Sequence, residues 1–202
     1  PNIQIDFHEM GSNSTYYFEP SPSSMHSPLL PQASYDWNVR LARYHAQALD
    51  RLGSLYYTKE VFDNFSPVYG STYPDFHGGV GVTVEQASSR GLVQDTANGP
   101  LEFRFTIRNQ LAVGLATIRG AVAEHAGLFQ LQKDFFRSAR EQGRRNAYAA
   151  YVFGDPADAT TSRRLLDLLL THRIAVHALD APLTVDGRTY TPGSAWVVPA
   201  AQ

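Results

Sequence analysis

The sequence predicts an α/β protein with a larger N-terminal part, built of strands and long helices, and a small C-terminal α/β module. Two segments, 3–8 and 80–85, alternate apolar and polar residues with the period of two that is typical of half-buried strands. Apolar residues recur with helical spacing over 34–52, 106–124 and 128–140. Towards the C-terminus, short strand-like runs alternate with one helical run, which favours a separate α/β module.

Composition indicates a folded protein with a hydrophobic core. The 202 residues are 43% hydrophobic and 18% charged, and the net charge is −2. This charge gives no electrostatic reason to expect nucleic acid or an anionic membrane as a partner. No apolar stretch approaches the roughly 20 residues that span a bilayer. Cysteine is absent, which excludes disulfides, thiolate metal sites and a cysteine nucleophile.

The first predicted strand starts almost at the first residue, and we therefore expect the chain to be cut from a longer protein. The strand places His8 on its polar face. Residues 11–34 are rich in Gly, Ser and Pro and predict a long surface loop. A helix follows, with Ser34 as its expected N-cap and Gly53 as its stop. Residues 54–78 are irregular and aromatic.

The second predicted strand ends by presenting Glu85 on its polar side. An acidic residue at the end of so apolar a strand is rarely an ordinary solvent-exposed charge. A purely structural alternative is that Glu85 forms an ion pair with an arginine such as Arg90. For His8 the corresponding alternative is a histidine that is hydrogen-bonded at the end of a strand. From composition alone, these structural alternatives are the stronger ones.

The C-terminal module is predicted as a β-α-β unit followed by a hairpin. Asp186-Gly187 is a strong signal for a two-residue hairpin turn. We place the boundary so that residues 1–143 form the first domain and 144–202 the module. The expected strands are 147–153, 174–179, 183–185, 189–190 and 194–198, and the expected helix is 162–170.

Three stretches together resemble a known family. They are "DFHEMGSNSTYYF" from Asp6, "LGSLYYTKEVFDNFSPVYGSTYPDFHGGVGVTVEQASSRG" from Leu52 and "FRFTIRNQ" from Phe103. Over roughly residues 1–125, the chain resembles the C-terminal half of the catalytic domain of the zinc carboxypeptidases, the carboxypeptidase A-like metallopeptidases. The resemblance implies part of a mixed sheet flanked by helices, and it is closest to a bacterial branch in which a second α/β domain follows.

The resemblance also implies roles for particular residues. In this family a His-x-x-Glu pair and a later histidine hold the zinc, and an open position holds water. His8 matches the later histidine, and Glu85 matches the general base that takes a proton from the zinc-bound water. A mobile tyrosine that contacts the peptide substrate corresponds to Tyr69 or Tyr73, with aromatic packing as the alternative. Many relatives act outside the cytoplasm, which favours a periplasmic or secreted location.

The sequence departs from the family because it contains no His-x-x-Glu. We therefore expect the chain to be an inactive fragment of a zinc metallocarboxypeptidase that holds zinc weakly by itself. The alternative is a non-catalytic fold fragment or a module that binds peptide or glycan. Residues 146–202 resemble the start of a glutamine-amidotransferase-like domain, but they lack the cysteine nucleophile. A fragment of a sheet also exposes an edge, so self-association through that edge is expected.

Overall fold

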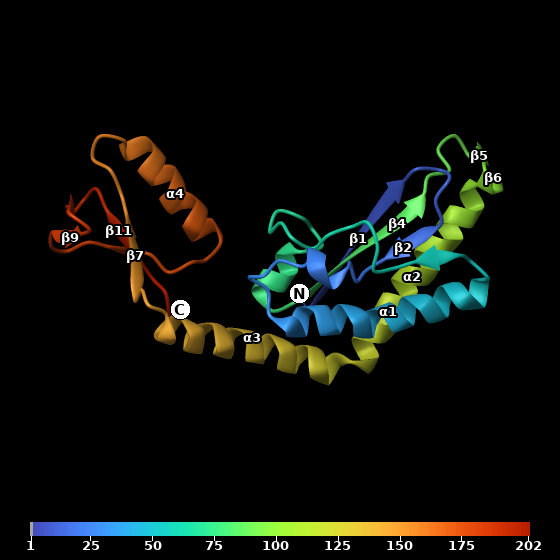
Figure 1. The fold of residues 1–202 in the computed structure, drawn as a ribbon, viewed down its shortest axis with the longest axis horizontal. Coiled ribbons are helices and arrows are strands. Elements are labelled where there is room, and N and C mark those ends of the chain that lie inside the picture. The colour runs from blue at the N-terminus through green and yellow to red at the C-terminus, as the bar shows by residue number, and fades with distance from the viewer. Residues whose placement is uncertain (1) are drawn as a thin grey trace. The chain divides into compact units, whose positions relative to one another are not determined.

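The computed structural model describes residues 2–202, and the chain divides into two units after Phe135. The first unit is an α/β arrangement in which a mixed sheet packs against helices, and the second contains small antiparallel sheets (Figure 1). Within the described residues, no helix is long and apolar enough to cross a membrane. The predicted α/β class is therefore confirmed at this coarse level.

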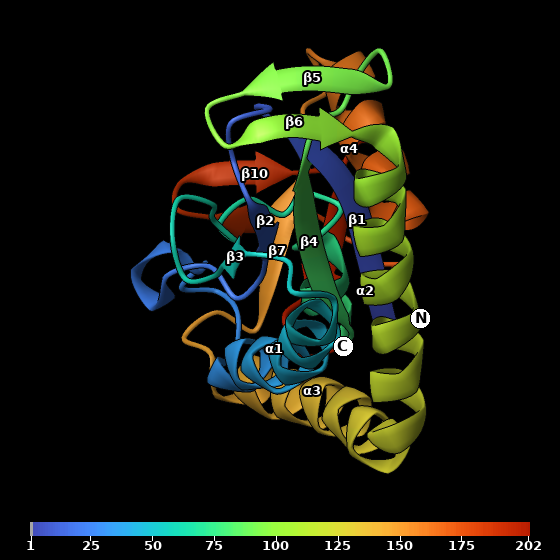
Figure 2. The same ribbon diagram turned by 90° about the vertical axis from the view of Figure 1, so that its right-hand side faces the viewer.

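The sheet of the first unit has four strands in the order β1-β4-β2-β3. The inner strand β4 (Val80–Ala87) pairs in parallel with β1 (Ile3–Met10) and antiparallel with β2 (Tyr16–Phe18). The two-residue β3 (Tyr56–Tyr57) pairs in parallel with β2. Figure 2 shows β4 between β1 and β2. Both strands that alternation predicted are present, and the sheet is mixed.

The expectation of a surface loop over 11–34 is wrong in its first half, because β2 lies there and is completely buried. Three consecutive aromatic residues form this strand, and their high β-propensity and large apolar area favour a place inside the sheet. The strand is too short for alternation to reveal it. A 3₁₀ helix (Ser23–Met25) follows in the remainder of the segment.

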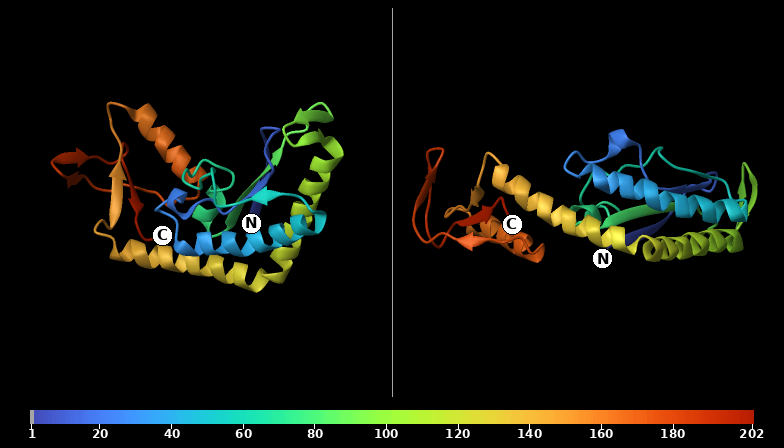
Figure 3. Two further views of the ribbon diagram at one scale, coloured as in Figure 1. Left: turned by 45° about the vertical axis from the view of Figure 1, so that its right-hand side comes forward. Right: turned by 90° about the horizontal axis from the view of Figure 1, so that it is seen from below.

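The chain has three helices of 21 residues: α1 (Gln32–Leu52) lies between β2 and β3, and α2 (Phe103–Ala123) and α3 (His125–Arg145) follow β4. Ser34 is not the N-cap of α1: the helix begins two residues earlier after Pro31, and Ser34 is buried in its first turn. The predicted stop is correct, since Gly53 adopts a left-handed conformation (φ 64°) at the C-cap. α1 and α2 lie side by side against the sheet (Figure 3).

The core of the first unit lies between the sheet and the helices. Val80, Val82 and Val84 of β4 point towards Leu41 and Leu49 of α1, and the partly buried apolar side chains of β1 join them. Because side chains alternate along a strand, the polar residues Asp6 and His8 of β1 and Thr83 and Glu85 of β4 point to the opposite face. That face of the sheet therefore carries polar side chains where the core face carries apolar ones.

A β-hairpin before α2 was not predicted. It consists of β5 (Val93–Thr96) and β6 (Gly99–Glu102). Asn98-Gly99, a pair that favours hairpin turns, lies at the turn, with Asn98 between the strands and Gly99 as the first residue of β6, and was the available signal. A 3₁₀ helix, η2 (Tyr73–His77), lies within the irregular aromatic segment.

The second unit contains each predicted element, although the bounds of most differ: the first two strands are shorter than expected and the helix is longer. A three-stranded antiparallel sheet has the order β7-β11-β8, and Asp158 caps α4 by accepting a hydrogen bond from the Thr161 amide (3.0 Å). The hairpin turn is the one expected, with positive φ at Asp186 (48°) and Gly187 (79°). The elements are β7 (Ala150–Phe153), α4 (Ala159–Thr171), β8 (His177–Ala178), β9 (Leu183–Val185), β10 (Arg188–Tyr190) and β11 (Trp196–Pro199).

The apolar residues whose spacing predicted α2 do not face the core. Val113 and Ala116 are buried, together with polar residues such as Asn109, whereas the residues whose spacing predicted the helix are exposed. These are Ile107, Leu111, Leu115, Ile118 and Val122. No strand of the described residues pairs with the outer edge of β1. The first unit therefore presents an apolar helix face and an open sheet edge.

We predict that the isolated chain self-associates through these surfaces. Light scattering should show a mass above that of a monomer, and the double substitution Leu111→Lys and Ile118→Lys should shift the population towards monomer. Both side chains are about 60% exposed (60% and 61%), so the free energy of unfolding should change by no more than about 0.5 kcal/mol. Leu29→Lys, an exposed apolar residue away from α2, serves as control. A monomeric wild-type chain would contradict this expectation.

Candidate functional site

Three neighbouring strands present polar side chains on the face of the sheet that points away from the core. The parallel register of β1 and β4 places His8 opposite Glu85 and Asp6 opposite Thr83. On the other side of β4, Tyr17 of β2 lies opposite Glu85. Residues that are opposite one another across a sheet share a face, so these groups gather at one place. The expected convergence of His8 and Glu85 at the ends of adjacent strands is present.

A cavity of about 320 Å³ covers this place and is bounded by the segment that precedes η2. His8 and Glu85 both line it, and so do two further carboxylates, Asp6 and Glu19. We call it the His8–Glu85 cavity. Its remaining lining residues are Val61, Phe62, Asp63, Tyr69, Gly70, Ser71 and Thr83.

The carboxylate of Glu85 is set up to accept a proton. The residue is only 8% exposed, and its Oε2 has no hydrogen-bond partner among the described residues. Burial raises the pKa of Glu85, His8 counteracts the shift, and the negative Asp6 adds to it. A carboxylate with a raised pKa and a free oxygen beside a cavity suits a general base.

The imidazole of His8 is oriented by Asp6, because its Nε2 lies 3.0 Å from Asp6 Oδ2. A carboxylate that accepts the Nε2–H fixes the tautomer, and the lone pair of Nδ1 is then available to a hydrogen-bond donor or a metal ion. However, residues 2–202 contain no group of three or more His, Cys, Asp or Glu side chains that could hold a metal ion. The residues present therefore do not form a complete zinc site by themselves.

Two acidic residues of the first unit are deeply buried, namely Glu19, which lines the cavity, and Asp75. Burial raises the pKa of Glu19 well above its ordinary value, although Asn64 donates a hydrogen bond to its Oε2 (3.0 Å). Burial raises the pKa of Asp75 to about 7, and the Gly81 amide partly offsets this shift by donating to Oδ1 (3.2 Å). Burial therefore favours the protonated form of both side chains, because an ionised carboxylate in such a place is poorly solvated.

The covering segment approaches β4 closely at a glycine. A Cβ at Gly81 would lie only 1.7 Å from the carbonyl oxygen of Ser71, so only glycine fits here. The adjacent Gly70 carbonyl accepts a hydrogen bond from Gln4 Nε2 (2.8 Å). These contacts attach the segment to both strands and hold it over the site.

Of the two candidate tyrosines, the structure brings only Tyr69 to the His8–Glu85 cavity. Tyr69 is 43% exposed, which leaves its ring accessible at the cavity. Tyr73 does not line the cavity, and its ring lies against His77, with 4.4 Å between the ring centroids. Substrate contact therefore remains a prediction that suits Tyr69 better.

Comparison with protein-family models, curated proteins and solved structures finds no match. The function is therefore inferred from the geometry of the site and from the residues that form it.

Sequence reasoning did not identify Asp6, Glu19 and Tyr17 as residues of the site. Asp6 shares a strand face with His8 two residues later, so alternation was an available signal for it. Glu19 and Tyr17 depend on β2, which was not predicted, and no local pattern marks them. Arg90, the structural alternative as a partner of Glu85, does not pair with it in the described residues. The backbone amide of Arg90 donates a hydrogen bond to Ser88 Oγ (3.4 Å).

We predict that the isolated chain binds zinc weakly. His8 supplies one imidazole, and zinc affinity depends on several ligands held together. After dialysis against metal-free buffer, elemental analysis should show much less than one zinc per chain. One tightly held zinc that is lost in His8→Ala would show that a complete site exists within this chain.

The stability of the chain should depend on the ionisation of Asp75. Between pH 4 and about 7, folded Asp75 keeps a proton that the unfolded chain has released, so the free energy of unfolding falls as the pH rises through this range. The contribution is about 2–4 kcal/mol. Urea unfolding of wild type and Asp75→Asn should therefore differ in pH dependence, with a flatter curve for the variant. Parallel curves would contradict a raised pKa at Asp75.

Proposed function

We propose that the first unit is part of a zinc-dependent metallocarboxypeptidase domain that hydrolyses C-terminal peptide bonds. In this proposal Glu85 is the general base and His8 is one metal ligand, and the other ligands lie outside residues 2–202. The finer fold assignment, a zinc-carboxypeptidase-like sheet, belongs to the same proposal.

The observation that supports it best is the register of β1 and β4. It aligns His8 with Glu85 at the ends of two parallel strands, and both side chains line one cavity. Ligand and base must lie side by side for a base to act on water held near the ligand. A histidine and an acid that were placed by chance on unrelated strands would not be expected to share both a register position and a cavity.

The chain's own groups suggest how the acid works. Glu85 is desolvated and its Oε2 is free, so it can take a proton from an attacking water and return it to the leaving amine. Asp6 holds the His8 ring in one orientation. Tyr69 lies at the cavity and is exposed enough to contact a peptide.

The second candidate function is a non-catalytic module that binds a peptide. It is favoured by one observation, namely that the described residues contain no group of three metal ligands. The two proposals differ in what Glu85 does: in a catalytic domain its loss abolishes turnover, whereas in a binding module it alters affinity alone.

The test compares Glu85→Gln with His8→Ala in a protein that contains this chain together with a His-x-x-Glu segment. Glu85→Gln should retain zinc and lose peptide hydrolysis by about 10²–10⁴-fold, because the amide keeps the shape but cannot accept a proton. His8→Ala should lose both zinc and turnover. Zinc content and release of the C-terminal residue are measured for each variant.

Glu9→Gln is the matched control. Glu9 is next to His8 in β1 but belongs to the other face of the strand, and its Oε2 accepts a hydrogen bond from Ser88 Oγ (3.0 Å). Zinc content and turnover should stay near the wild-type values. Near-normal turnover in Glu85→Gln would reject the proposed base and favour the binding module.

A further inference from the structure

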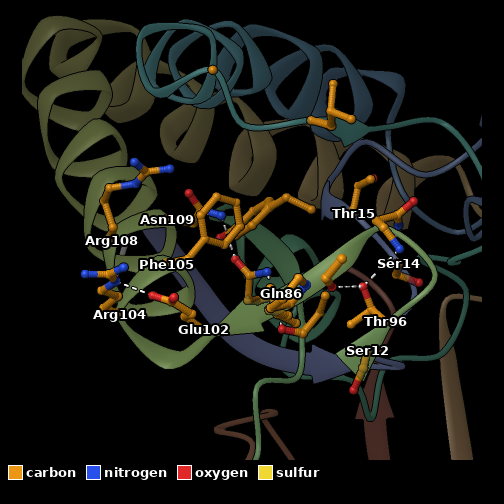
Figure 4. Close-up of a pocket in the computed structure, with 18 residues that line it drawn as sticks. Ser12, Ser14, Thr15, Gln86, Thr96, Glu102, Arg104, Phe105, Arg108 and Asn109 are labelled. Atoms are coloured by element: carbon orange, nitrogen blue, oxygen red, sulfur yellow. Dashed lines mark hydrogen bonds and ion pairs between the residues drawn. The ribbon is translucent and has the colours of Figure 1, made fainter. Parts of the chain in front are cut away.

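A second and larger cavity, of about 730 Å³, lies at the start of α2. Its walls come from the first turns of α2, the β5–β6 hairpin, the end of β4 and residues 12–16 (Figure 4). It shares no lining residue with the His8–Glu85 cavity. Its volume falls within the range of small-molecule sites, about 300–1,000 Å³.

Two arginines of α2 line this cavity, and they differ in their partners. Arg104 forms an ion pair with Glu102, which neutralises its charge. Arg108 has no carboxylate partner in the part of the chain that the structure describes. Its guanidinium lies over the ring of Phe105, 4.9 Å from the centroid, and Nη2 donates to Ser54 Oγ (3.4 Å). The cavity therefore contains a positioned positive charge without a counter-charge.

A chain of hydrogen bonds leads from this arginine to a buried amide. Ser54 Oγ donates to Asn109 Oδ1 (2.8 Å), and Asn109 Nδ2 donates to Gln86 Oε1 (3.0 Å). Because Oε1 of Gln86 is the acceptor, its Nε2 is left as a donor. The acceptor of Nε2 among the described residues is the Ala87 carbonyl at 3.4 Å, a long contact for a group with two N–H bonds.

Gln86 is only 2% exposed and lines the cavity. A buried amide donor with spare capacity favours an acceptor that enters the cavity. Gln86 and Arg108 both line the cavity and offer donors, and the guanidinium is charged, so an anionic acceptor such as a carboxylate suits them. The walls also include apolar surface from Leu55, Leu101 and Phe105, which a bare inorganic anion would leave in contact with water.

We propose that this cavity binds a small molecule with a free carboxylate next to an apolar group. The carboxylate accepts hydrogen bonds from Arg108 and from Gln86 Nε2, and the apolar group packs against Phe105 and Leu101. Two sources share this chemistry, namely the C-terminal end of a peptide and an aliphatic acid. The hydroxyl groups of Ser14 and Thr15, on the side opposite the arginines in Figure 4, offer further hydrogen bonds to a peptide.

The test is titration calorimetry on the full 202-residue chain with N-acetylphenylalanine and its C-terminal amide as probes. The acid should bind at least about tenfold more tightly than the amide, because hydrogen bonds to charged groups are the stronger ones. Arg108→Gln should remove most of this preference. Arg104→Gln, one turn earlier on the same helix and in the same cavity, should change the affinity for the acid by less than about twofold, because Arg104 is already paired.

A second variant and a second probe make the result specific. Gln86→Leu should also weaken binding of the acid, with circular dichroism confirming that this buried substitution still folds. If it does not fold, the shift of the Gln86 side-chain amide signal in the NMR spectrum of the wild type on addition of acid, but not of amide, provides the same information. Octanoate separates the two sources: tighter binding of octanoate assigns the site to aliphatic acids, and tighter binding of N-acetylphenylalanine assigns it to peptide ends.

Four results would overturn the proposal. Equal binding of acid and amide would show that the cavity does not recognise the carboxylate. Unchanged affinity in Arg108→Gln would show that Arg108 does not bind the acid. Displacement of the acid by an equal concentration of inorganic phosphate would show a general anion site without a role for the apolar wall. Absence of binding by any acid probe at millimolar concentration would reject the site altogether.

Discussion

The parallel pairing of β1 with β4 determines where His8 and Glu85 lie relative to one another in the His8–Glu85 cavity. Apolar residues of both strands face the helices, so the hydrophobic core fixes the register. A slip of one residue would turn the polar residues of β1 towards α1 and α2 and expose its isoleucines, and the lost burial makes that arrangement unfavourable. The packing of one face of the sheet thereby positions the chemistry of the other.

Two acidic side chains near that cavity are buried at a cost in stability. Glu19 and Asp75 are enclosed with few hydrogen-bond partners, and each remains more readily protonated than an exposed acid. The close contact between Gly81 and Ser71 brings the covering segment against β4. Buried polar groups with few partners are common where a site needs a defined shape. The arrangement around Glu85 therefore fits a place that serves function more than stability.

Elements of the fold were predictable from the sequence where a long periodic pattern or a specific turn signal marked them. β1, β4 and the hairpin at Asp186-Gly187 followed from alternation and from a specific turn signal. β2 has three residues and gives no period, and the buried face of α2 is largely polar, so hydrophobic spacing indicated its exposed side. The burial of β2 and the orientation of α2 both depend on tertiary contacts, which no local pattern contains. The N-terminus of α1 was missed because Pro31 precedes the helix directly, without a side-chain cap.

The candidate site was predictable only in part. His8 and Glu85 stood out because each ends a regular strand, and a family resemblance gave them roles. Glu19 joins them through β2 and its backbone hydrogen bond to the Thr83 carbonyl (3.2 Å), a long-range pairing that no local pattern contains. The Arg108–Ser54–Asn109–Gln86 chain likewise connects residues from distant parts of the sequence.

The position of β1 at the edge of the sheet has a consequence for how the His8–Glu85 cavity moves. At Val84 and Glu85, β4 is paired with β1 on one side and with β2 on the other, whereas half of the amides of β1 point to the open edge. Exchange of amide hydrogen for deuterium should therefore be slow at Val84 and Glu85 and fast at alternate positions of β1. Glu85 thus lies on the most firmly held strand and His8 on one that can detach locally, so thermal fluctuation alters the separation of the two side chains mainly by moving the histidine.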